Sequence, residues 1–221
     1  MTERIVIYGA GGLGREILQV VREMQACRKD VECAAFVVDE AFATADVVNG
    51  VPVHRNFHGI AQDECVRFVI AIGDPAARAR IARAVESAIG PRFATVIHPR
   101  ALIDGGVSVG VGSMIMGLTS LTTECQLGRH VLINPGCTVA HDNTIEDFAT
   151  LSPGVNLAGR VRVGEGCLLG IGASVAPDVN IGRWSVVGAG ACVIRDVAPH
   201  SVAVGVPAQT IGTSQVEARI P

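Results

Sequence analysis

Residues 150–173 read TLSPGV NLAGRV RVGEGC LLGIGA, four consecutive blocks of six in which the second residue is always Leu or Val. The same frame holds from residue 102 to residue 197. All sixteen blocks carry Ile, Val or Leu at the second position, and Val, Ala, Cys, Ser, Thr or Asn at the sixth. A six-residue repeat of this length is typical of a β-helix. We therefore predict a triangular prism in which three blocks form each coil and neighbouring coils lie about 4.8 Å apart.

The first 97 residues follow a different pattern. Strand-like apolar runs alternate with helix-like stretches, as in a small α/β unit with a parallel sheet. Asp74 followed by Pro75 is a typical helix start. The expected elements are strands at residues 4–8, 33–38, 66–72 and 93–97 and helices at residues 13–26 and 75–90. We expect two domains, residues 1–97 and residues 98–221, the second ending in a C-terminal tail.

The composition argues against several classes of function. The net charge is −3 and no cluster of Lys and Arg is present, which gives no basis for nucleic-acid binding. No apolar run approaches the roughly 18 residues of a membrane span, and the N-terminus does not resemble a signal peptide, so we expect a soluble cytoplasmic protein. The seven cysteines form no CxxC pair and the six histidines show no metal-ligand spacing, so we expect neither disulfides nor a metal site.

A glycine-rich loop joins the first expected strand to the first expected helix. GAGGLG at residues 9–14 fits the GxGxxG pattern, which places phosphate groups at a helix N-terminus and, taken alone, suggests NAD. A unit of about four strands is only one mononucleotide half of a Rossmann fold, so one nucleotide fits better than two. The alternative is that the glycines serve only the turn. The candidate substrate contacts are Gly11, Gly12, Leu13, Gly14, Asp39, Gly73 and Asp74.

Seven stretches, spread over essentially the whole chain, resemble one protein family. They are IYGAGGLGRE, FVIAIGDPAAR, HPRALI, VAHD, LSPGVNLAG, LLGIGASV and VGVPA. They are similar to the bacterial hexapeptide-repeat sugar-nucleotide acetyltransferases, which include sialic acid O-acetyltransferase, the bacillosamine-pathway N-acetyltransferase and GDP-perosamine N-acetyltransferase. The resemblance implies an α/β half-Rossmann domain followed by a left-handed parallel β-helix. It also implies acetyl-CoA as co-substrate, a nucleotide-linked amino sugar as substrate, and a homotrimer with active sites between subunits.

The VAHD stretch contains the candidate general base. His141 is the fourth residue of its block, at a corner of the predicted prism, and Asp142 follows it. The resemblance places a catalytic histidine and an adjacent acid at these positions. Gly159 lies one coil beyond His141, and the family uses the glycine there to donate its amide to the reacting carbonyl oxygen. Taken by itself, a lone histidine is more often an ordinary surface or packing residue.

The resemblance also implies a groove for acetyl-CoA along the prism. The matching positions are Thr150, Gly159, Gly172, Ala173, Arg195, Gly205, Pro207 and Ala208. The chain departs from its relatives at three places. Some relatives have histidine at the position of Leu13, relatives often have histidine at that of Thr150, and a basic residue often takes the place of Gln209.

These observations together predict an N-acetyltransferase that acts on the 4-amino group of a nucleotide-linked 4-amino-4,6-dideoxy sugar for cell-surface polysaccharide. GDP-perosamine is the lead substrate, and a UDP-linked amino sugar is the next candidate. The nearest alternative is an O-acetyltransferase of the sialic acid type, in which the same base deprotonates a hydroxyl. Two remoter alternatives are a non-catalytic trimeric scaffold and an NAD-dependent oxidoreductase. The oxidoreductase would leave the sixteen blocks without a role.

Overall fold

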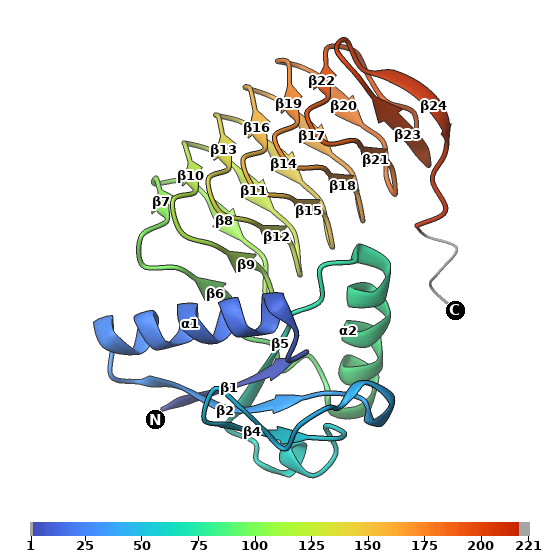
Figure 1. Ribbon diagram of the computed structural model, residues 1–221. Coiled ribbons are helices and arrows are strands. Elements are labelled where there is room, and N and C mark those ends of the chain that lie inside the picture. The colour runs from blue at the N-terminus through green and yellow to red at the C-terminus, as the bar shows by residue number, and fades with distance from the viewer. Residues whose placement is uncertain (1, 217–221) are drawn as a thin grey trace.

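The computed structural model describes residues 2–216, which form an α/β unit with a triangular prism stacked on it (Figure 1). The α/β unit contains a five-stranded sheet in the order β3-β4-β2-β1-β5. Its strands are β1 (Glu3–Tyr8), β2 (Val31–Val37), β3 (Val47–Val48), β4 (Val51–His54) and β5 (Val66–Ile70). Its helices are α1 (Gly12–Cys27), α2 (Pro75–Ile89) and the short 3₁₀ helices η1 (Glu40–Phe42) and η2 (Ile60–Gln62). All strands except β3 run parallel to their neighbours, as the half-Rossmann prediction requires.

The two helices begin in different ways. At α2 the Asp74 carboxylate accepts a hydrogen bond from the Ala77 amide at 2.8 Å, and Pro75 takes the first turn, where no donor is needed. At α1 no side chain caps the N-terminus, which follows Gly11. Within the described residues the first amide groups of α1 therefore have no side-chain acceptor, and the helix dipole favours an anion there.

The prediction of a fourth strand of this sheet at residues 93–97 was wrong. Phe93 makes a single parallel bridge to Phe68, and the chain then leaves the α/β sheet. β6 (Val96–Ile97) pairs instead with β9 (Met114–Ile115) in the prism. The apolar run is buried in both units, so its hydrophobicity alone did not identify its partner.

The hairpin of β3 and β4 at the edge of the sheet was not predicted. Asn49 and Gly50 connect the two strands, and both have positive φ angles (48° and 79°). Asn-Gly is the preferred sequence for such a two-residue turn, because both positions must adopt the left-handed conformation. This dipeptide is the signal from which the hairpin could have been predicted.

The prism has three walls, in which all strands except the last, β24, run parallel, and each hexad supplies one strand. Wall 1 contains β7 (Leu102–Ile103), β10 (Ser120–Leu121), β13 (Thr138–Val139), β16 (Asn156–Leu157), β19 (Ser174–Val175) and β22 (Cys192–Val193). Wall 2 contains β8 (Ser108–Val109), β11 (Gln126–Leu127), β14 (Thr144–Ile145), β17 (Arg162–Val163) and β20 (Asn180–Ile181). Wall 3 contains β6, β9, β12 (Leu132–Ile133), β15 (Thr150–Leu151), β18 (Leu168–Leu169), β21 (Val186–Val187), β23 (Ser201–Val204) and β24 (Gln209–Thr213).

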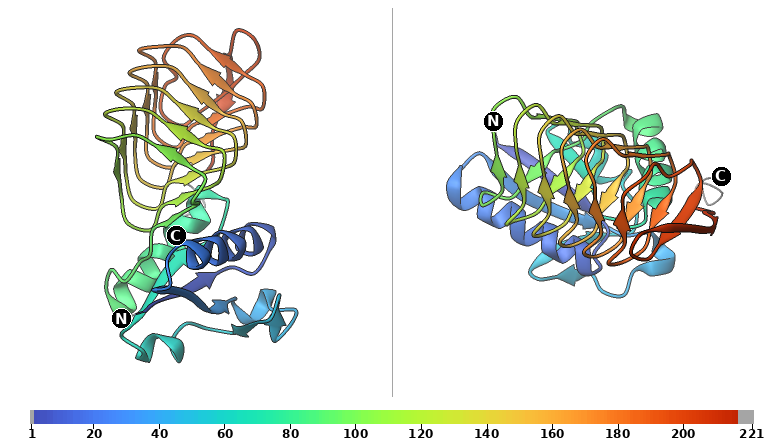
Figure 2. Two further views of the ribbon diagram at one scale, coloured as in Figure 1. Left: turned by 90° about the vertical axis from the view of Figure 1, so that its left-hand side faces the viewer. Right: turned by 90° about the horizontal axis from the view of Figure 1, so that it is seen from above.

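The coils stack in one column above the α/β unit (Figure 2). Within the repeat each strand pairs with the strand 18 residues further on, as Thr138 pairs with Asn156, which confirms the predicted coil length. The closing coil is shorter, since Val186 pairs with Val202, and the hairpin of β23 and β24 ends the column. The end of the predicted tail, residues 217–221, lies outside the described residues. Within residues 2–216, no helix has the length and apolar character to cross a bilayer.

The fifth residue of each hexad turns the corner of the prism. In fifteen of the sixteen hexads this residue has a φ between 54° and 82°, the left-handed conformation. Glycine occupies seven of these positions and adopts the conformation without a steric penalty. Side chains at the second and sixth positions fill the interior, where nearly all of them are buried.

The three corners carry different chemistry at this fifth position. Corner 1–2, between walls 1 and 2, carries the charged residues Glu124, Asp142, Arg160 and Asp178. Corner 2–3 carries the buried aromatic rings His130, Phe148 and Trp184, and corner 3–1 carries Gly136, Gly154, Gly172 and Gly190. The α/β unit packs on wall 3 through α1 and on corner 2–3 through α2. In a triangular cross-section, corner 1–2 is the corner opposite wall 3, so it faces away from the α/β unit.

Candidate active site

The predicted base lies at corner 1–2, in the turn after β13. Nδ1 of His141 lies 2.7 Å from Oδ2 of Asp142, and the two side chains are 49% and 52% exposed. Beneath them the buried Asn143 amide donates to the carbonyl oxygens of Ala140 at 2.7 Å and Ala158 at 2.9 Å, which fixes the turn. A carboxylate on Nδ1 holds the ring N–H on that side and leaves the Nε2 lone pair to accept a proton.

Gly159 lies directly over the His141 ring, as the coil length predicted. A Cβ added to Gly159 would lie 2.6 Å from Cε1 and 2.7 Å from Nε2 of His141, closer than any side chain tolerates. Within the described residues, the Gly159 amide donates to no acceptor, while its carbonyl accepts from Asp178. The ring nitrogen and an unused N–H group therefore lie side by side at one exposed corner.

An ion pair occupies the next two coils of the same corner. Arg160 binds Asp178 through two hydrogen bonds, of 2.6 and 2.8 Å. These hydrogen bonds lower the pKa of the Asp178 carboxyl, and His141 adds to the effect. Because Arg160 is occupied by Asp178, the carboxylate of Asp142 remains the partner of His141.

The cofactor positions at the C-terminal end of the prism lie together. Arg195, Pro207 and Ala208 line one pocket of about 170 Å³, which Gln209 also lines. Gly205 is exposed beside it, at a φ of 96°. Arg195 occupies the same hexad position as His141 and Gly159, three coils from His141, and therefore about 14 Å along the corner.

Two further predicted cofactor positions, Gly172 and Ala173 in the LLGIGASV stretch, do not lie at this corner. Gly172 is the exposed fifth residue of a hexad at corner 3–1, with a φ of 69°, and Ala173 points into the filled interior. The structure therefore does not bring Gly172 and His141 together within one chain. It separates them by the width of wall 1.

Thr150 is buried, although it was predicted to contact the cofactor. It is 2% exposed, and its hydroxyl accepts a hydrogen bond from Nη2 of Arg78 at 2.7 Å and donates to the Gly73 carbonyl at 3.3 Å. This gives Thr150 no open surface on which acetyl-CoA could lie. The contact instead joins β15 to the loop before α2.

The buried arginine that Thr150 contacts was not predicted. Arg78 is 0% exposed and donates to the carbonyls of His130 at 2.9 Å and Phe148 at 2.6 Å in the prism. It also donates to the carbonyls of Ile72 at 2.7 Å and Gly73 at 3.1 Å in its own domain. Burial lowers the pKa of Arg78 to about 9, a shift that Asp74 opposes, so Arg78 is charged at neutral pH. Sequence reasoning missed it because its prism partners, the carbonyls of His130 and Phe148 and the Thr150 hydroxyl, lie far along the chain.

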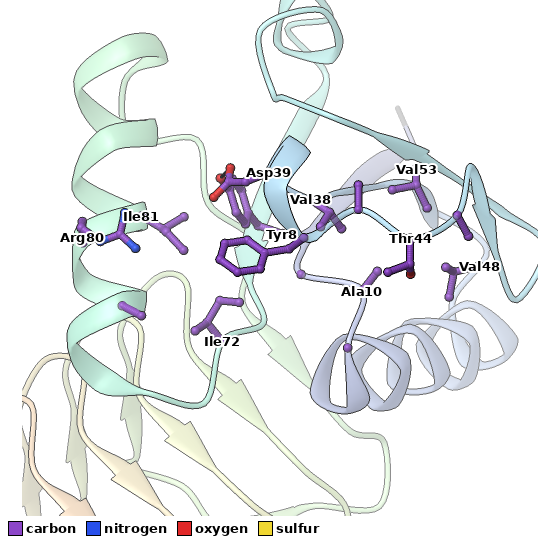
Figure 3. A pocket seen from close by; sticks show the side chains of 16 residues that line it. Tyr8, Ala10, Val38, Asp39, Thr44, Val48, Val53, Ile72, Arg80 and Ile81 are labelled. Carbon is purple, nitrogen blue, oxygen red and sulfur yellow. Dashed lines mark hydrogen bonds between the residues drawn. The ribbon is translucent and has the colours of Figure 1, made fainter. Parts of the chain in front are cut away.

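The glycine-rich loop forms one end of a pocket in the α/β unit (Figure 3). This pocket, here named the nucleotide pocket, has a volume of about 460 Å³ and opens at the carboxyl ends of β1 and β2. Gly11 and Asp39 line it, as do the unpredicted Tyr8 and Arg80. Gly14 is required by packing, since an added Cβ would lie 1.9 Å from the carbonyl oxygen of Gly9.

The remaining substrate positions lie near the pocket without lining it. Gly12 and Leu13 open α1, Asp74 caps α2, and the Gly73 carbonyl accepts from Arg78 and Thr150. Gly12 and Gly73 have open space where a side chain would begin. Among residues 2–216, no group of three or more His, Cys, Asp or Glu side chains is placed to hold a metal ion.

Comparison with known proteins identifies both units. Residues 4–85 match the PglD N-terminal domain family, and residues 160–195 match the bacterial transferase hexapeptide family. The GDP-perosamine N-acetyltransferase of Escherichia coli O157:H7 is 29% identical over 149 residues, which cover 66% of this chain and 66% of that protein.

Two solved structures share the whole fold. One is a histidine-to-asparagine variant of perosamine N-acetyltransferase from Caulobacter crescentus in complex with CoA and GDP-perosamine. It is 33% identical with a TM-score of 0.84, and the match covers 94% of this chain and 96% of that one. The other is the acetyltransferase domain of PglB from Neisseria gonorrhoeae in complex with acetyl coenzyme A, 26% identical with a TM-score of 0.84, covering 96% and 100%.

These matches confirm the predicted architecture, an α/β half-Rossmann domain followed by a left-handed parallel β-helix. They span both units, and the identity to perosamine N-acetyltransferase extends over nearly the full length of each chain. The chain therefore belongs to the family of hexapeptide-repeat sugar-nucleotide acetyltransferases that includes perosamine N-acetyltransferase and the PglB acetyltransferase domain.

Proposed function

We propose that this chain transfers the acetyl group of acetyl-CoA to the 4-amino group of a nucleotide-linked 4-amino-4,6-dideoxy sugar, with GDP-perosamine as the lead substrate. The observation that carries the proposal is the His141–Asp142 pair directly beneath Gly159, where a base and an unused N–H group share one exposed corner. The ligands of the Caulobacter crescentus relative, CoA and GDP-perosamine, support the choice of both substrates.

His141 acts as the general base in this proposal. The neutral amine of the sugar attacks the thioester carbonyl, and the new C–N bond leaves a proton to be removed from nitrogen. Nε2 of His141 accepts this proton, since Asp142 holds the N–H on the other side of the ring. Asp142 holds Nδ1–H and stabilises the imidazolium that forms. The C–S bond then breaks, and the CoA thiolate leaves and takes up a proton.

Gly159 stabilises the tetrahedral intermediate. The carbonyl oxygen becomes negatively charged when the amine attacks, and the Gly159 N–H, which has no acceptor among the described residues, is free to donate to it. A fixed donor of this kind is typically worth about 3 kcal/mol of transition-state stabilisation. The absence of a Cβ at Gly159 lets the donor lie beside the base.

Acetyl-CoA would extend along corner 1–2 from His141 toward Arg195. The reacting thioester lies at His141, and the pantetheine arm covers the roughly 14 Å of three coils. The phosphates then reach Arg195 beside the pocket that Pro207 and Ala208 line. Gly205 and Gln209 border the same end. Thr150 has no part in this path.

A complete site requires a second copy of the chain. The nucleotide pocket belongs to the α/β unit, which packs on wall 3 and corner 2–3, whereas His141 lies at the opposite corner. A substrate held in the nucleotide pocket would reach the base of a neighbouring copy. Gly172, at corner 3–1 of the copy that holds the substrate, would then flank acetyl-CoA from the other side of the groove. We propose a homotrimer with three such shared sites, acting in the cytoplasm.

Subunit mixing tests the shared site. Gly12→Asp adds a negative charge where the substrate phosphates would lie, at a position with open space, and His141→Asn removes the base. Each variant alone is expected to be nearly inactive. Unfolding and refolding a mixture of the two should restore activity, because some interfaces then combine an intact pocket with an intact base. A mixture no more active than its components would show that each chain holds a whole site.

Release of free thiol from acetyl-CoA tests the function itself. The acceptors are a panel of GDP-, UDP- and dTDP-linked 4-amino sugars together with sialic acid. We expect turnover with a GDP-linked 4-amino sugar. Turnover of sialic acid with none of the amino sugars would favour O-acetylation, and no turnover with any acceptor would contradict the proposal.

A further inference from the structure

One polar side chain lies in the apolar interior of the prism, directly behind the candidate active site. Asn143 is the sixth residue of the hexad that contains His141, and it is 0% exposed. The sixth positions of the other wall 1 hexads face the same corner and carry Val or Cys, namely Val107, Cys125, Val161, Val179 and Val197. The prism therefore builds this column without an amide, and Asn143 departs from the rule at the coil of the proposed base.

The Asn143 amide joins the turn of His141 to the turn of Gly159. Its Nδ2 donates to the Ala140 carbonyl at 2.7 Å and to the Ala158 carbonyl at 2.9 Å, and it lies 3.3 Å from the His141 carbonyl oxygen. Ala140 precedes the proposed base, and Ala158 precedes Gly159 on the next coil. Since three carbonyl oxygens surround Nδ2, the side-chain amide fits only in this orientation. Asn143 thus ties the two coils together at the reacting corner.

The hydrogen bond to Ala158 sets the direction of the Gly159 N–H group. The Ala158 carbonyl and the Gly159 N–H belong to one planar trans peptide group, so they point in opposite directions. Asn143 holds the carbonyl toward the interior of the prism, and the N–H therefore points outward, at the corner where His141 lies. A hydrogen bond accepted by a peptide carbonyl also strengthens the N–H of the same peptide as a donor.

The oxygen of the Asn143 side chain has no such role. Oδ1 is buried and has no hydrogen-bond partner in the part of the chain that the structure describes. A buried polar atom without a partner lowers the stability of a fold. Valine, which Val161 places in the interior one coil further on, would avoid this loss. An amide that weakens the interior at this one coil is better explained by the reaction than by packing.

We propose that Asn143 is a positioning residue for the oxyanion donor, and that it orients the Ala158–Gly159 peptide so that the Gly159 N–H meets the carbonyl oxygen of acetyl-CoA beside His141. The inference rests on the proposed function for the reaction itself. It adds a residue that touches neither substrate, because Asn143 is fully buried and acts through the peptide group that it holds.

Asn143→Val tests the proposal, because it installs the residue that the neighbouring coils carry. The carbonyls of Ala140 and His141 keep other donors, so among the described residues only the Ala158 carbonyl loses its donor. We expect kcat for acetyl transfer to fall at least about tenfold, since complete loss of an oxyanion donor costs about 100-fold or more. KM for acetyl-CoA and for the sugar nucleotide should change less than about twofold, because the affected contact forms only in the transition state.

Two further measurements separate this role from a structural one. The urea midpoint of Asn143→Val should stay close to that of the wild type, since removal of the unpaired oxygen offsets the lost hydrogen bond. Asn143→Ser should recover most of the lost kcat. A serine at the sixth position reaches the next coil, as the Ser113 hydroxyl does when it donates to the Gly128 carbonyl at 2.9 Å. Loss of both kcat and urea midpoint in Asn143→Val, without recovery in Asn143→Ser, would overturn the proposal.

A matched control uses another buried sixth position. Ser185 is 0% exposed at corner 2–3, and its hydroxyl donates to the Ala198 carbonyl at 2.9 Å and accepts from the Ser201 amide at 3.1 Å. Ser185→Val removes interior hydrogen bonds of the same kind away from His141. It should lower the urea midpoint and leave kcat unchanged, which is the opposite of the result expected for Asn143→Val.

The outcome is separable from that of the proposed function. Wild-type kcat in Asn143→Val would overturn the positioning role and leave the proposed function standing. If the wild type transfers no acetyl group, NMR of the glycine-labelled protein without ligands still tests Asn143. The Gly159 amide peak, assigned by its loss in Gly159→Ala, should move in Asn143→Val and stay in place in Ser185→Val. A peak that Asn143→Val leaves unmoved would overturn the proposal.

Discussion

A Cβ on Gly159 would lie 2.7 Å from Nε2 of His141, so the His141 ring occupies the space that a side chain at position 159 would need. Gly159→Ala should push the ring out of line and crowd the adjacent N–H group. We expect kcat for acetyl transfer to fall at least about 100-fold, the cost of losing one oxyanion donor. Steady-state kinetics with GDP-perosamine measures this.

A glycine in the same corner column provides the control for this variant. Gly105 holds the same hexad position two coils before His141, has no positive φ, and has no atom within 4 Å of an added Cβ. Gly105→Ala should therefore retain near-normal kcat. If Gly159→Ala were as active as Gly105→Ala, Gly159 would have no part in the reaction.

Removal of the proposed base should abolish most of the turnover. His141→Asn keeps a polar side chain of similar reach but accepts no proton, so we expect kcat to fall at least about 100-fold. The fold and the proposed trimer should stay intact, because the His141 side chain is half exposed. His58→Asn, at an exposed loop histidine, is the control. Near-normal turnover of His141→Asn in the same assay would mean that the histidine is only structural.

His130 should make the fold sensitive to acid. It is 1% exposed at corner 2–3, between the rings of Phe93 and Phe148, and neither ring nitrogen has a partner within the described residues. Burial, together with the charges of Arg129 and Arg78, lowers the pKa of His130 to about 3. An unfolded chain protonates this histidine near pH 6.5, so the folded state loses stability as pH falls below that value.

The loss of stability in acid follows from the pKa values of His130 in the folded chain, about 3, and in the unfolded chain, about 6.5. Between pH 7 and pH 5, His130 alone should lower the free energy of unfolding by about 2 kcal/mol. His130→Phe should remove this part of the pH dependence, and Phe148 shows that the left-handed corner accepts phenylalanine. Urea unfolding of both proteins at several pH values is the measurement. Equal acid sensitivity in the two would show that His130 is not responsible.

Arg78 should contribute strongly to the junction of the two units. Arg78→Met fills similar space but leaves the carbonyl groups of His130 and Phe148 and the Thr150 hydroxyl without their donor. We expect a loss of at least about 3 kcal/mol in the free energy of unfolding. Arg78→Lys keeps the charge with fewer directed donors. Its free energy of unfolding should lie between those of the wild type and Arg78→Met.

Arg80→Met, at an exposed arginine two residues further along α2, should change unfolding stability by no more than about 0.5 kcal/mol. A wild-type urea midpoint for Arg78→Met would mean that its hydrogen bonds add nothing to the junction.

The hexad frame could be predicted from sequence because it is a local rule repeated sixteen times. The second residue of each block identified the interior, and adding one coil to His141 identified Gly159 as its neighbour. The left-handed corners also had a sequence signal that was not used. Glycine occupies seven of the fifteen corner positions, always at the fifth place of the block.

The features that sequence reasoning missed depend on contacts between distant segments. Arg78 looks like any polar residue of an amphipathic helix until the carbonyls of corner 2–3 surround it. Thr150 matched a cofactor position by resemblance, yet its hydroxyl is held by Arg78 and Gly73. The run at residues 93–97 is apolar enough for either sheet, and only the three-dimensional packing assigns β6 to the prism.

Identification of the acetylated product tests the central claim most directly. The chain is incubated with acetyl-CoA and GDP-perosamine, and the sugar nucleotide is analysed by mass spectrometry before and after treatment with hydroxylamine, which cleaves esters and spares amides. We predict that the product gains one acetyl group and that hydroxylamine leaves it unchanged. A product that loses its acetyl group to hydroxylamine, or a sugar nucleotide recovered without any acetyl group, would contradict N-acetylation by His141.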